Sequence, residues 1–116
     1  MTGIDHSKAA PFVVLCADDE QPDLEALVRD LERICAGAIS VEGFDDAAEL
    51  LARAVDLCAA GTQVPLVLAD HVMPRMSGTE LLLALQEHPE FRATRKVLLS
   101  GRTTIDDLNR ALNRGA

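Results

Sequence analysis

The sequence predicts an α/β domain built around a doubly wound parallel sheet. Its 116 residues, 48% of them hydrophobic, suit one compact domain with a substantial core. Short apolar runs alternate with segments of helical periodicity in the order βαβαβαβα. The connections between them are short, so we expect parallel strands, right-handed crossovers and helices on both faces of the sheet. In such sheets a ligand binds at the carboxyl ends of the strands.

The composition argues against several classes of function. With 11 basic and 19 acidic residues the net charge is −8, whereas direct nucleic-acid binding requires a basic face. No stretch approaches about 18 apolar residues, which a membrane span would need. Residues 1–11 lack an apolar signal core, so we expect a flexible leader and a cytoplasmic protein. The cysteines form no metal-ligand pattern, and Cys16 is expected to be a buried, reduced thiol.

The first strand and helix are predicted between residues 12 and 37. Residues 12–17, FVVLCA, form a continuous apolar run, which suits a strand buried on both faces. Asp23 is expected to cap the helix that follows, with Pro22 directly before it, and Gly37 to end it. The apolar residues of this helix recur at helical spacing: Leu24, Leu27, Val28, Leu31 and Ile34.

A half-exposed strand and a second helix follow. In residues 38–43, AISVEG, Ile39 and Val41 alternate with polar or small residues, which indicates an edge strand. The next helix is predicted from about residue 45 to residue 60. Its inner face is expected to consist of Ala48, Leu51, Val55 and Cys58.

The last two strand–helix units have clear boundary signals. Residues 66–70, LVLAD, form the third strand, and Ser77 can cap a helix that Pro89 ends. Residues 96–100, KVLLS, form the fourth strand. Thr103 or Thr104 can cap the final helix. In the helix that begins after Ser77, the residues predicted to face the core are Leu81, Leu82 and Leu85. In the final helix they are Ile105, Leu108 and Leu112.

Polar side chains follow three of the predicted strands. Asp18 and Asp19 follow the first strand, Asp70 ends the third and Ser100 ends the fourth, so all four should gather in one pocket. Close carboxylates repel one another, and a divalent cation such as Mg²⁺ relieves that repulsion. A carboxylate beside the cation can attack phosphorus and form an acyl phosphate, while a hydroxyl bonds a phosphoryl oxygen.

Each of these groups alone also has a purely structural explanation. The acidic residues after the first strand can be stabilised by the positive end of the dipole of the helix that follows. Asp70 can cap a turn through its side chain, and Ser100 can be an ordinary turn residue. The functional interpretation depends on all of them holding together at neighbouring strand ends.

Four segments resemble the receiver domain of two-component response regulators. They are VVLCADDE, ADHVMPRMSGTELL, VLLSGR and ALNRGA, which occur in the family's order. The resemblance covers residues 12–116 and implies a flavodoxin-like (CheY-like) sheet of strand order 2-1-3-4-5. It also implies two-component phosphorelay signalling by a domain that is not an enzyme in its own right.

The resemblance assigns roles to individual residues. Asp70 would accept a phosphoryl group from a histidine kinase or phosphotransfer protein. Asp70 would also be a ligand to Mg²⁺. Asp19 would bind the ion directly, Asp18 would act through the ion or its waters, and the backbone carbonyl of Val72 would complete the protein ligands. Ser100 would be the switch hydroxyl.

Other family positions affect the loop and the lifetime of the phosphoryl group. Val72 and Arg102 occupy the positions that control access of water to the acyl phosphate, and the pair implies slow hydrolysis. Gly78 would allow the tight turn into the third helix. The resemblance also implies signalling partners and a possible C-terminal effector domain outside this chain.

The chain departs from the family pattern at its C-terminal end. The family's fifth strand, fifth helix and phosphate-binding Lys have no counterpart, and the two lysines, Lys8 and Lys96, lie elsewhere. We therefore expect residues 12–116 to be a receiver domain truncated at the C-terminus. Its fourth strand would be an edge, with Val97 and either Leu98 or Leu99 meeting water, which favours dimerisation or strand exchange.

Two alternatives stay open from the sequence. A receiver-like interaction module that never cycles phosphate would fit the absent Lys, although Asp18, Asp19 and Asp70 count against it. A metal-dependent phosphohydrolase of the haloacid dehalogenase type also uses an aspartate at a strand end. That family requires a DxDx[TV] motif, which ADDEQ does not match.

Overall fold

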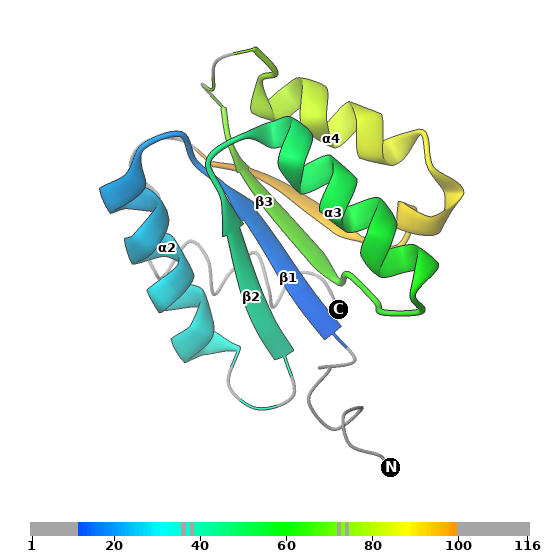
Figure 1. Ribbon diagram of the computed structural model, residues 1–116, viewed down its shortest axis with the longest axis horizontal. Helices are drawn as coiled ribbons and strands as arrows, with labels where there is room; N and C mark the ends of the chain where they lie inside the picture. Colours follow the sequence, from blue (N-terminus) through cyan, green and yellow to red (C-terminus); the bar gives the residue numbers. More distant parts are fainter. Residues whose placement is uncertain (1–11, 36, 38, 72, 74, 100–116) are drawn as a thin grey trace.

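The computed structural model describes residues 12–35, 37, 39–71, 73 and 75–99. Within them the four strands form one parallel sheet of order β2-β1-β3-β4, as predicted (Figure 1). The elements are β1 (Phe12–Ala17), α2 (Gln21–Ile34), β2 (Ile39–Phe44), α3 (Ala47–Ala59), β3 (Leu66–Asp70), α4 (Gly78–Gln86), the short 3₁₀ helix η1 (Pro89–Phe91) and β4 (Arg95–Leu99).

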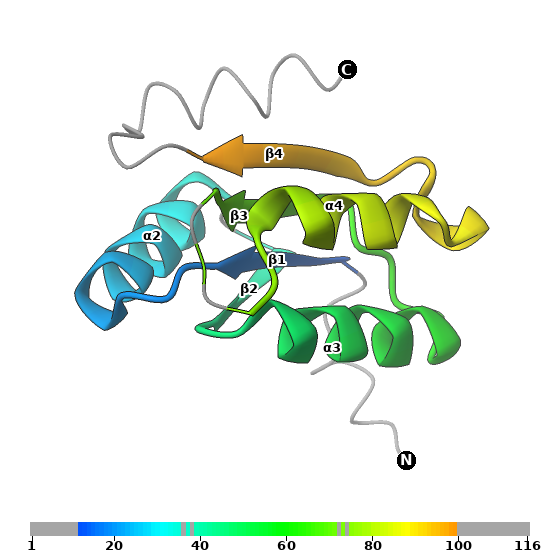
Figure 2. The same cartoon turned by 90° about the horizontal axis from the view of Figure 1, so that it is seen from above.

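The sheet is the middle layer of three. Helix α2 covers one face, and α3 and α4 cover the other (Figures 1 and 2). Because successive residues of a strand point to opposite faces, β1 and β3 supply side chains to both cores. The core under α3 and α4 contains Val13, Leu15, Ala17, Val67 and Ala69, and the core under α2 contains Val14, Cys16, Leu66 and Leu68.

Helix α2 begins earlier than predicted. Glu20 is its N-cap, so the expectation that Asp23 caps the helix is wrong: Asp23 lies inside the first turn. The reason is Pro22, whose fixed φ and missing N–H suit the first turn of a helix, so that the helix includes it. The predicted apolar face is confirmed, since Leu24, Leu27 and Leu31 are buried and Val28 and Ile34 pack beside them.

The inner face predicted for α3 is wrong by one residue. Its buried residues are Ala47, Leu50, Ala54 and Leu57, whereas Ala48 is exposed and Val55 is 40% exposed. The two stripes have the same spacing and are offset by about 100° around the helix. Asp46 caps the helix and fixes where it starts, and the stripe of alternating Ala and Leu then faces the sheet. Leu51 and Cys58 pack at the flank of that core.

The flanking strands of the described sheet, β2 and β4, are less buried than the central pair. Strand β2 lies at one edge and is only partly buried. Strand β4 has β3 as its one neighbour among the described strands. Of its apolar residues, Leu98 is 43% exposed, Val97 is half-buried and Leu99 is buried. The final helix predicted after Thr103 lies outside the described residues, and dimerisation through β4 stays a prediction.

The burial predicted for Cys16 is confirmed, and its thiol is free. Cys16, Cys35 and Cys58 are all unpaired, and Cys16 is buried in the centre of the sheet. Burial, together with the negative charge of Asp18, raises the pKa of Cys16 to about 12, so that the thiol stays protonated and unreactive. Within the described part of the chain, no helix is both long enough and apolar enough to span a bilayer.

Candidate functional site

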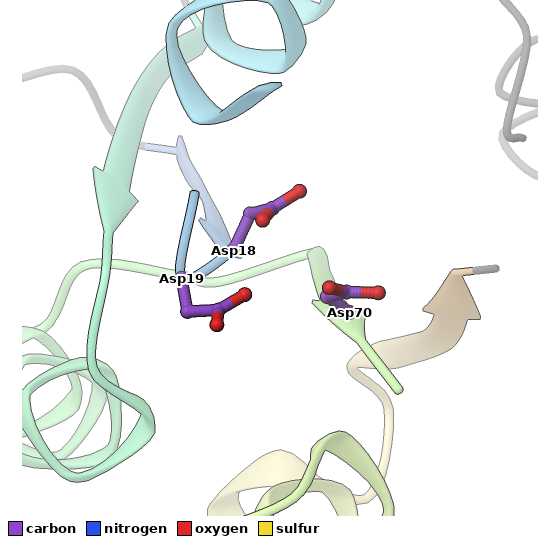
Figure 3. Close-up of side chains that lie close together, drawn as sticks. All are labelled: Asp18, Asp19 and Asp70. Carbon is purple, nitrogen blue, oxygen red and sulfur yellow. The ribbon is translucent and has the colours of Figure 1, made fainter. Parts of the chain in front are cut away.

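Three carboxylates meet at the carboxyl edge of the sheet. Asp18 and Asp19 directly follow β1, and Asp70 is the last residue of β3. These two strands are paired up to Ala17 and Ala69, so the residues that follow are neighbours. One carboxylate oxygen from each of the three aspartates lies within 4.8 Å of the other two (Figure 3). We call Asp18, Asp19 and Asp70 the acidic triad.

The triad has an unfavourable electrostatic environment when no cation is bound. Asp18 and Asp70 are half-buried, and Asp19 is exposed. Partial burial raises the pKa of Asp18, and the negative charges of Asp70 and Asp19 add to this effect. The backbone N–H of Glu20 donates a 3.0 Å hydrogen bond to Asp18 Oδ1, and this bond lowers the pKa of Asp18. The arrangement therefore favours a bound positive charge.

The geometry fits a hard divalent cation. Mg²⁺ prefers oxygen ligands at about 2.1 Å, so opposite ligands of its octahedron lie about 4.2 Å apart. The triad oxygens lie within 4.8 Å of one another, so Asp18, Asp19 and Asp70 are the residues that would hold such an ion. Val72, the other predicted ligand, lies outside the described residues, as do Ser100 and Arg102.

The loop after Asp70 is anchored at several points. The backbone N–H of His71 donates to the carbonyl of Leu99 at 3.1 Å, and the side chain of Met73 is buried in the core. Ser77 caps α4 as predicted, and Glu80 completes a capping box by accepting from the Ser77 N–H. These contacts fix the chain on both sides of the loop.

Gly78 is required for a reason that differs from the expected one. It is the first residue of α4 and lies directly against the strand end. A Cβ at this position would collide with the backbone carbonyl of Asp70 and would approach Leu98 Cδ1 to 2.8 Å. The glycine therefore serves the close approach of helix and strand, and not a turn conformation that other residues avoid.

Lys96 takes no part in the site. Its Nζ donates to the carbonyls of Phe91 at 2.6 Å and Thr94 at 2.8 Å, at the amino edge of the sheet. Partial burial lowers the pKa of this ammonium group. Lys96 is thus held away from the acidic triad, in agreement with the expectation that it does not replace the family's phosphate-binding Lys.

The turn between β2 and α3 contacts the loops around the acidic triad, and these contacts were not predicted from the sequence. Gln21 Nε2 donates to Asp45 Oδ2 at 3.0 Å, and Arg75 Nη2 lies 3.6 Å from Asp46 Oδ2. These contacts join loops that are far apart in the chain. No local pattern could have identified them, because Asp46 alone indicates only a helix cap.

A parallel α/β sheet with an acidic triad at its carboxyl edge defines a class of α/β domains whose ligand site lies at the ends of the strands. Within that class, this chain belongs to the response regulator receiver domain family, whose profile matches residues 14–116. The family membership predicted from the four motifs is therefore confirmed.

Individual relatives agree with this assignment. The two-component response regulator ARR6 of Arabidopsis thaliana is 29% identical over 109 residues, which cover 91% of this chain and 59% of the relative. The chain thus spans about three-fifths of the length of this curated relative.

Solved structures show the same fold. Chemotaxis protein CheY4 of Vibrio cholerae superposes with a TM-score of 0.74 at 19% identity, covering 90% of this chain and 98% of that one. A receiver domain protein from Clostridium thermocellum gives 0.70 at 20% identity, with coverages of 89% and 92%. The BeF3-activated response regulator Chey2-Mg²⁺ from Sinorhizobium meliloti gives 0.57 at 23% identity, with coverages of 93% and 78%.

Proposed function

We propose that this chain accepts a phosphoryl group on Asp70 in an Mg²⁺-dependent phosphorelay. The observation that carries the proposal is the acidic triad, which brings Asp70 together with Asp18 and Asp19 at the edge where this fold binds ligands. Membership of the receiver family supports the same chemistry. So does the relative that is described as a BeF3-activated, Mg²⁺-containing response regulator.

In the proposed reaction a carboxylate oxygen of Asp70 attacks the phosphorus of a phosphohistidine on the donor protein. The new P–O bond gives an acyl phosphate, while the P–N bond breaks and its electron pair stays with the imidazole nitrogen, which takes up a proton. Asp18 and Asp19 would hold the Mg²⁺ ion, with the Val72 carbonyl as a further ligand. When bound, Mg²⁺ neutralises charge on the phosphoryl oxygens.

The other proposed roles concern the phosphorylated state. The Ser100 hydroxyl would donate a hydrogen bond to a phosphoryl oxygen, and Arg102 would restrict the access of water to it. The donor would be a histidine kinase or a phosphotransfer protein in the cytoplasm, and the output would be a changed contact with an effector. The family assignment supports these roles.

The proposal is tested by incubating the chain with acetyl phosphate and MgCl₂ and measuring its intact mass. We expect one phosphoryl adduct, located on Asp70 by peptide mapping and absent when EDTA replaces MgCl₂. Continuous release of phosphate over many turnovers would instead indicate a phosphohydrolase. Absence of both an adduct and Mg²⁺ binding would indicate an interaction module that does not cycle phosphate.

A further inference from the structure

The turn between β2 and α3 contacts the loop that carries the first two aspartates of the triad. The backbone N–H of Asp18 donates to the carbonyl of Phe44 at 3.0 Å. Two residues past Asp19, the Gln21 side chain donates to Asp45 Oδ2, also at 3.0 Å. The position of the Asp18–Asp19 loop is therefore set in part by the Phe44–Asp46 turn.

The same turn also contacts the loop that follows Asp70. Asp46 Oδ2 lies 3.6 Å from Arg75 Nη2, while Asp46 Oδ1 accepts a hydrogen bond from the Ala48 N–H at the start of α3. The Asp46 side chain is only 18% exposed, whereas that of Arg75 is 81% exposed. The capping aspartate is thus the fixed member of this pair, and the largely exposed Arg75 side chain extends to it.

The backbone of Arg75 supports the idea that this loop is held under constraint. Its φ is 69°, in the left-handed region, which is unfavourable for a residue that has a side chain. Such a conformation persists where its surroundings fix it. Here the buried Met73 precedes Arg75, the capping Ser77 follows it, and Asp46 binds its side chain.

We propose that the Phe44–Asp46 turn positions the acidic triad for cation binding, and that the Asp46–Arg75 pair is the tether to the Asp70 loop. Two members of the triad lie in the loop after β1 and the third ends β3, and this turn contacts both that loop and the loop after Asp70, so it constrains their separation. Asp46 and Arg75 are positioning residues, since they act through the loops. This inference rests on the proposed function, because it requires that the triad bind Mg²⁺.

For one variant, the loss of charge and the loss of the tether predict opposite changes in Mg²⁺ affinity, which makes the inference testable. Arg75→Asn removes a positive charge from the chain, so electrostatics alone would strengthen Mg²⁺ binding. Loss of the tether would weaken it. Asn also accepts the left-handed backbone at this position, which keeps the loop conformation accessible. Asp46→Asn keeps the helix cap, because Asn and Asp are similarly good N-caps.

The experiment is a calorimetric titration of the full chain with MgCl₂, applied to the parent, Arg75→Asn, Asp46→Asn and the double variant. We expect Arg75→Asn to bind Mg²⁺ about two- to five-fold more weakly, which is the range set by one exposed ion pair. The double variant, whose net charge equals that of the parent, should also bind more weakly. Arg75→Lys, which keeps the charge, should restore most of the affinity.

Arg92→Asn is the matched control, because Arg92 is exposed at the opposite edge of the sheet and its loss changes the net charge equally. Its affinity should equal that of the parent. If Arg75→Asn binds as tightly as this control or more tightly, or if the double variant matches the parent, the positioning role is refuted and only electrostatics remains. A parent chain that binds no Mg²⁺ would instead refute the proposed function, and the positioning role with it.

Discussion

The carboxyl and amino edges of the sheet carry groups of different chemistry. The carboxyl edge holds the acidic triad, in which three like charges lie within 4.8 Å. The amino edge holds a cleft of about 610 Å³. It is lined by the first residues of three strands, Ile39, Leu66 and Arg95, and by Val14, Phe91 and Thr94.

The polar groups at the amino edge are used to hold the backbone together. The Thr94 hydroxyl donates to the Val64 carbonyl at 2.6 Å, and the Arg95 N–H donates to the Pro65 carbonyl at 2.9 Å. At the other edge, charged groups repel one another. In this fold, therefore, the candidate ligand site is indicated by the direction of the strands and not by the volume of a cleft.

The largest expected effect is on chemistry at the carboxyl edge. Asp70→Asn removes the nucleophilic oxygen and should abolish phosphorylation by acetyl phosphate, measured by intact mass. The fold should survive, because Asn has the same shape and relieves charge repulsion within the triad. The control is Asp56→Asn, which removes an exposed charge on α3 and should leave phosphorylation unchanged. Full labelling of the same peptide in the Asp70→Asn variant would sink the assignment of the acceptor.

The second prediction concerns the backbone carbonyl of Asp70, which belongs to the proposed acceptor residue and also packs against Gly78. Gly78→Ala would force α4 away from the carbonyl of Asp70 and from Leu98, since a Cβ cannot fit between them. We expect a loss of about 1–3 kcal/mol in the free energy of unfolding, measured with urea. Phosphorylation should also slow, because the displaced carbonyl belongs to the acceptor residue.

Thr79→Ala is the control for this variant, since Thr79 is exposed in the same helical turn. Its unfolding free energy should change by less than about 0.5 kcal/mol. A Gly78→Ala chain that unfolds at the same urea concentration as the parent would show that helix and strand can separate at little cost.

Features of these edges that depend on a short stretch of sequence were predicted correctly. Strand β3 was predicted with its full bounds because LVLAD is a continuous apolar run that ends in a charge. The same logic predicted that Asp18, Asp19 and Asp70 converge, since parallel strands place their carboxyl ends together. The face of α3 was not predicted correctly, because two stripes with identical spacing lie side by side on that helix.

Contacts between loops could not be predicted in this way. Asp45 and Asp46 carry no pattern that points to Gln21 or Arg75, and only the folded arrangement of three loops brings them together. The role of Gly78 has the same origin, because its neighbour across the contact is the carbonyl of Asp70. Periodicity gives the elements and their polarity, and tertiary contacts set the details of the site.

At the amino edge we expect an effect on stability alone. Thr94→Val keeps the shape of a buried side chain but leaves the Val64 carbonyl without its hydroxyl partner. This should cost about 1–2 kcal/mol of unfolding free energy, measured with urea. Phosphorylation by acetyl phosphate should stay within about two-fold of the parent.

Thr62→Val serves as the comparison for Thr94→Val, because Thr62 lines the same cleft and is less buried. It should cost less stability than Thr94→Val. If Thr94→Val instead reduced phosphorylation several-fold in a folded chain, the two edges would be coupled, and the division between a chemical edge and a structural edge would be wrong.

The smallest expected effect is a gain in stability at the carboxyl edge. Burial and the neighbouring carboxylates raise the pKa of Asp18, so the folded chain favours the protonated form relative to the unfolded chain. At neutral pH, where Asp18 is charged in both states, its charge therefore opposes folding. Asp18→Asn should raise the unfolding free energy of the metal-free chain, by less than about 1 kcal/mol because the group is only partly buried.

The pH dependence and the metal dependence of Asp18→Asn identify the cause. As pH falls below the ordinary Asp value of 3.8, the parent aspartate is protonated in both states, and the advantage of the variant should vanish. With MgCl₂ at neutral pH the order should reverse, because the parent gains stability by binding the ion and the variant binds it more weakly. Urea unfolding at pH 7 and pH 3, with EDTA or MgCl₂, measures both effects. A variant that is more stable than the parent in every condition would show that Asp18 contributes nothing to cation binding.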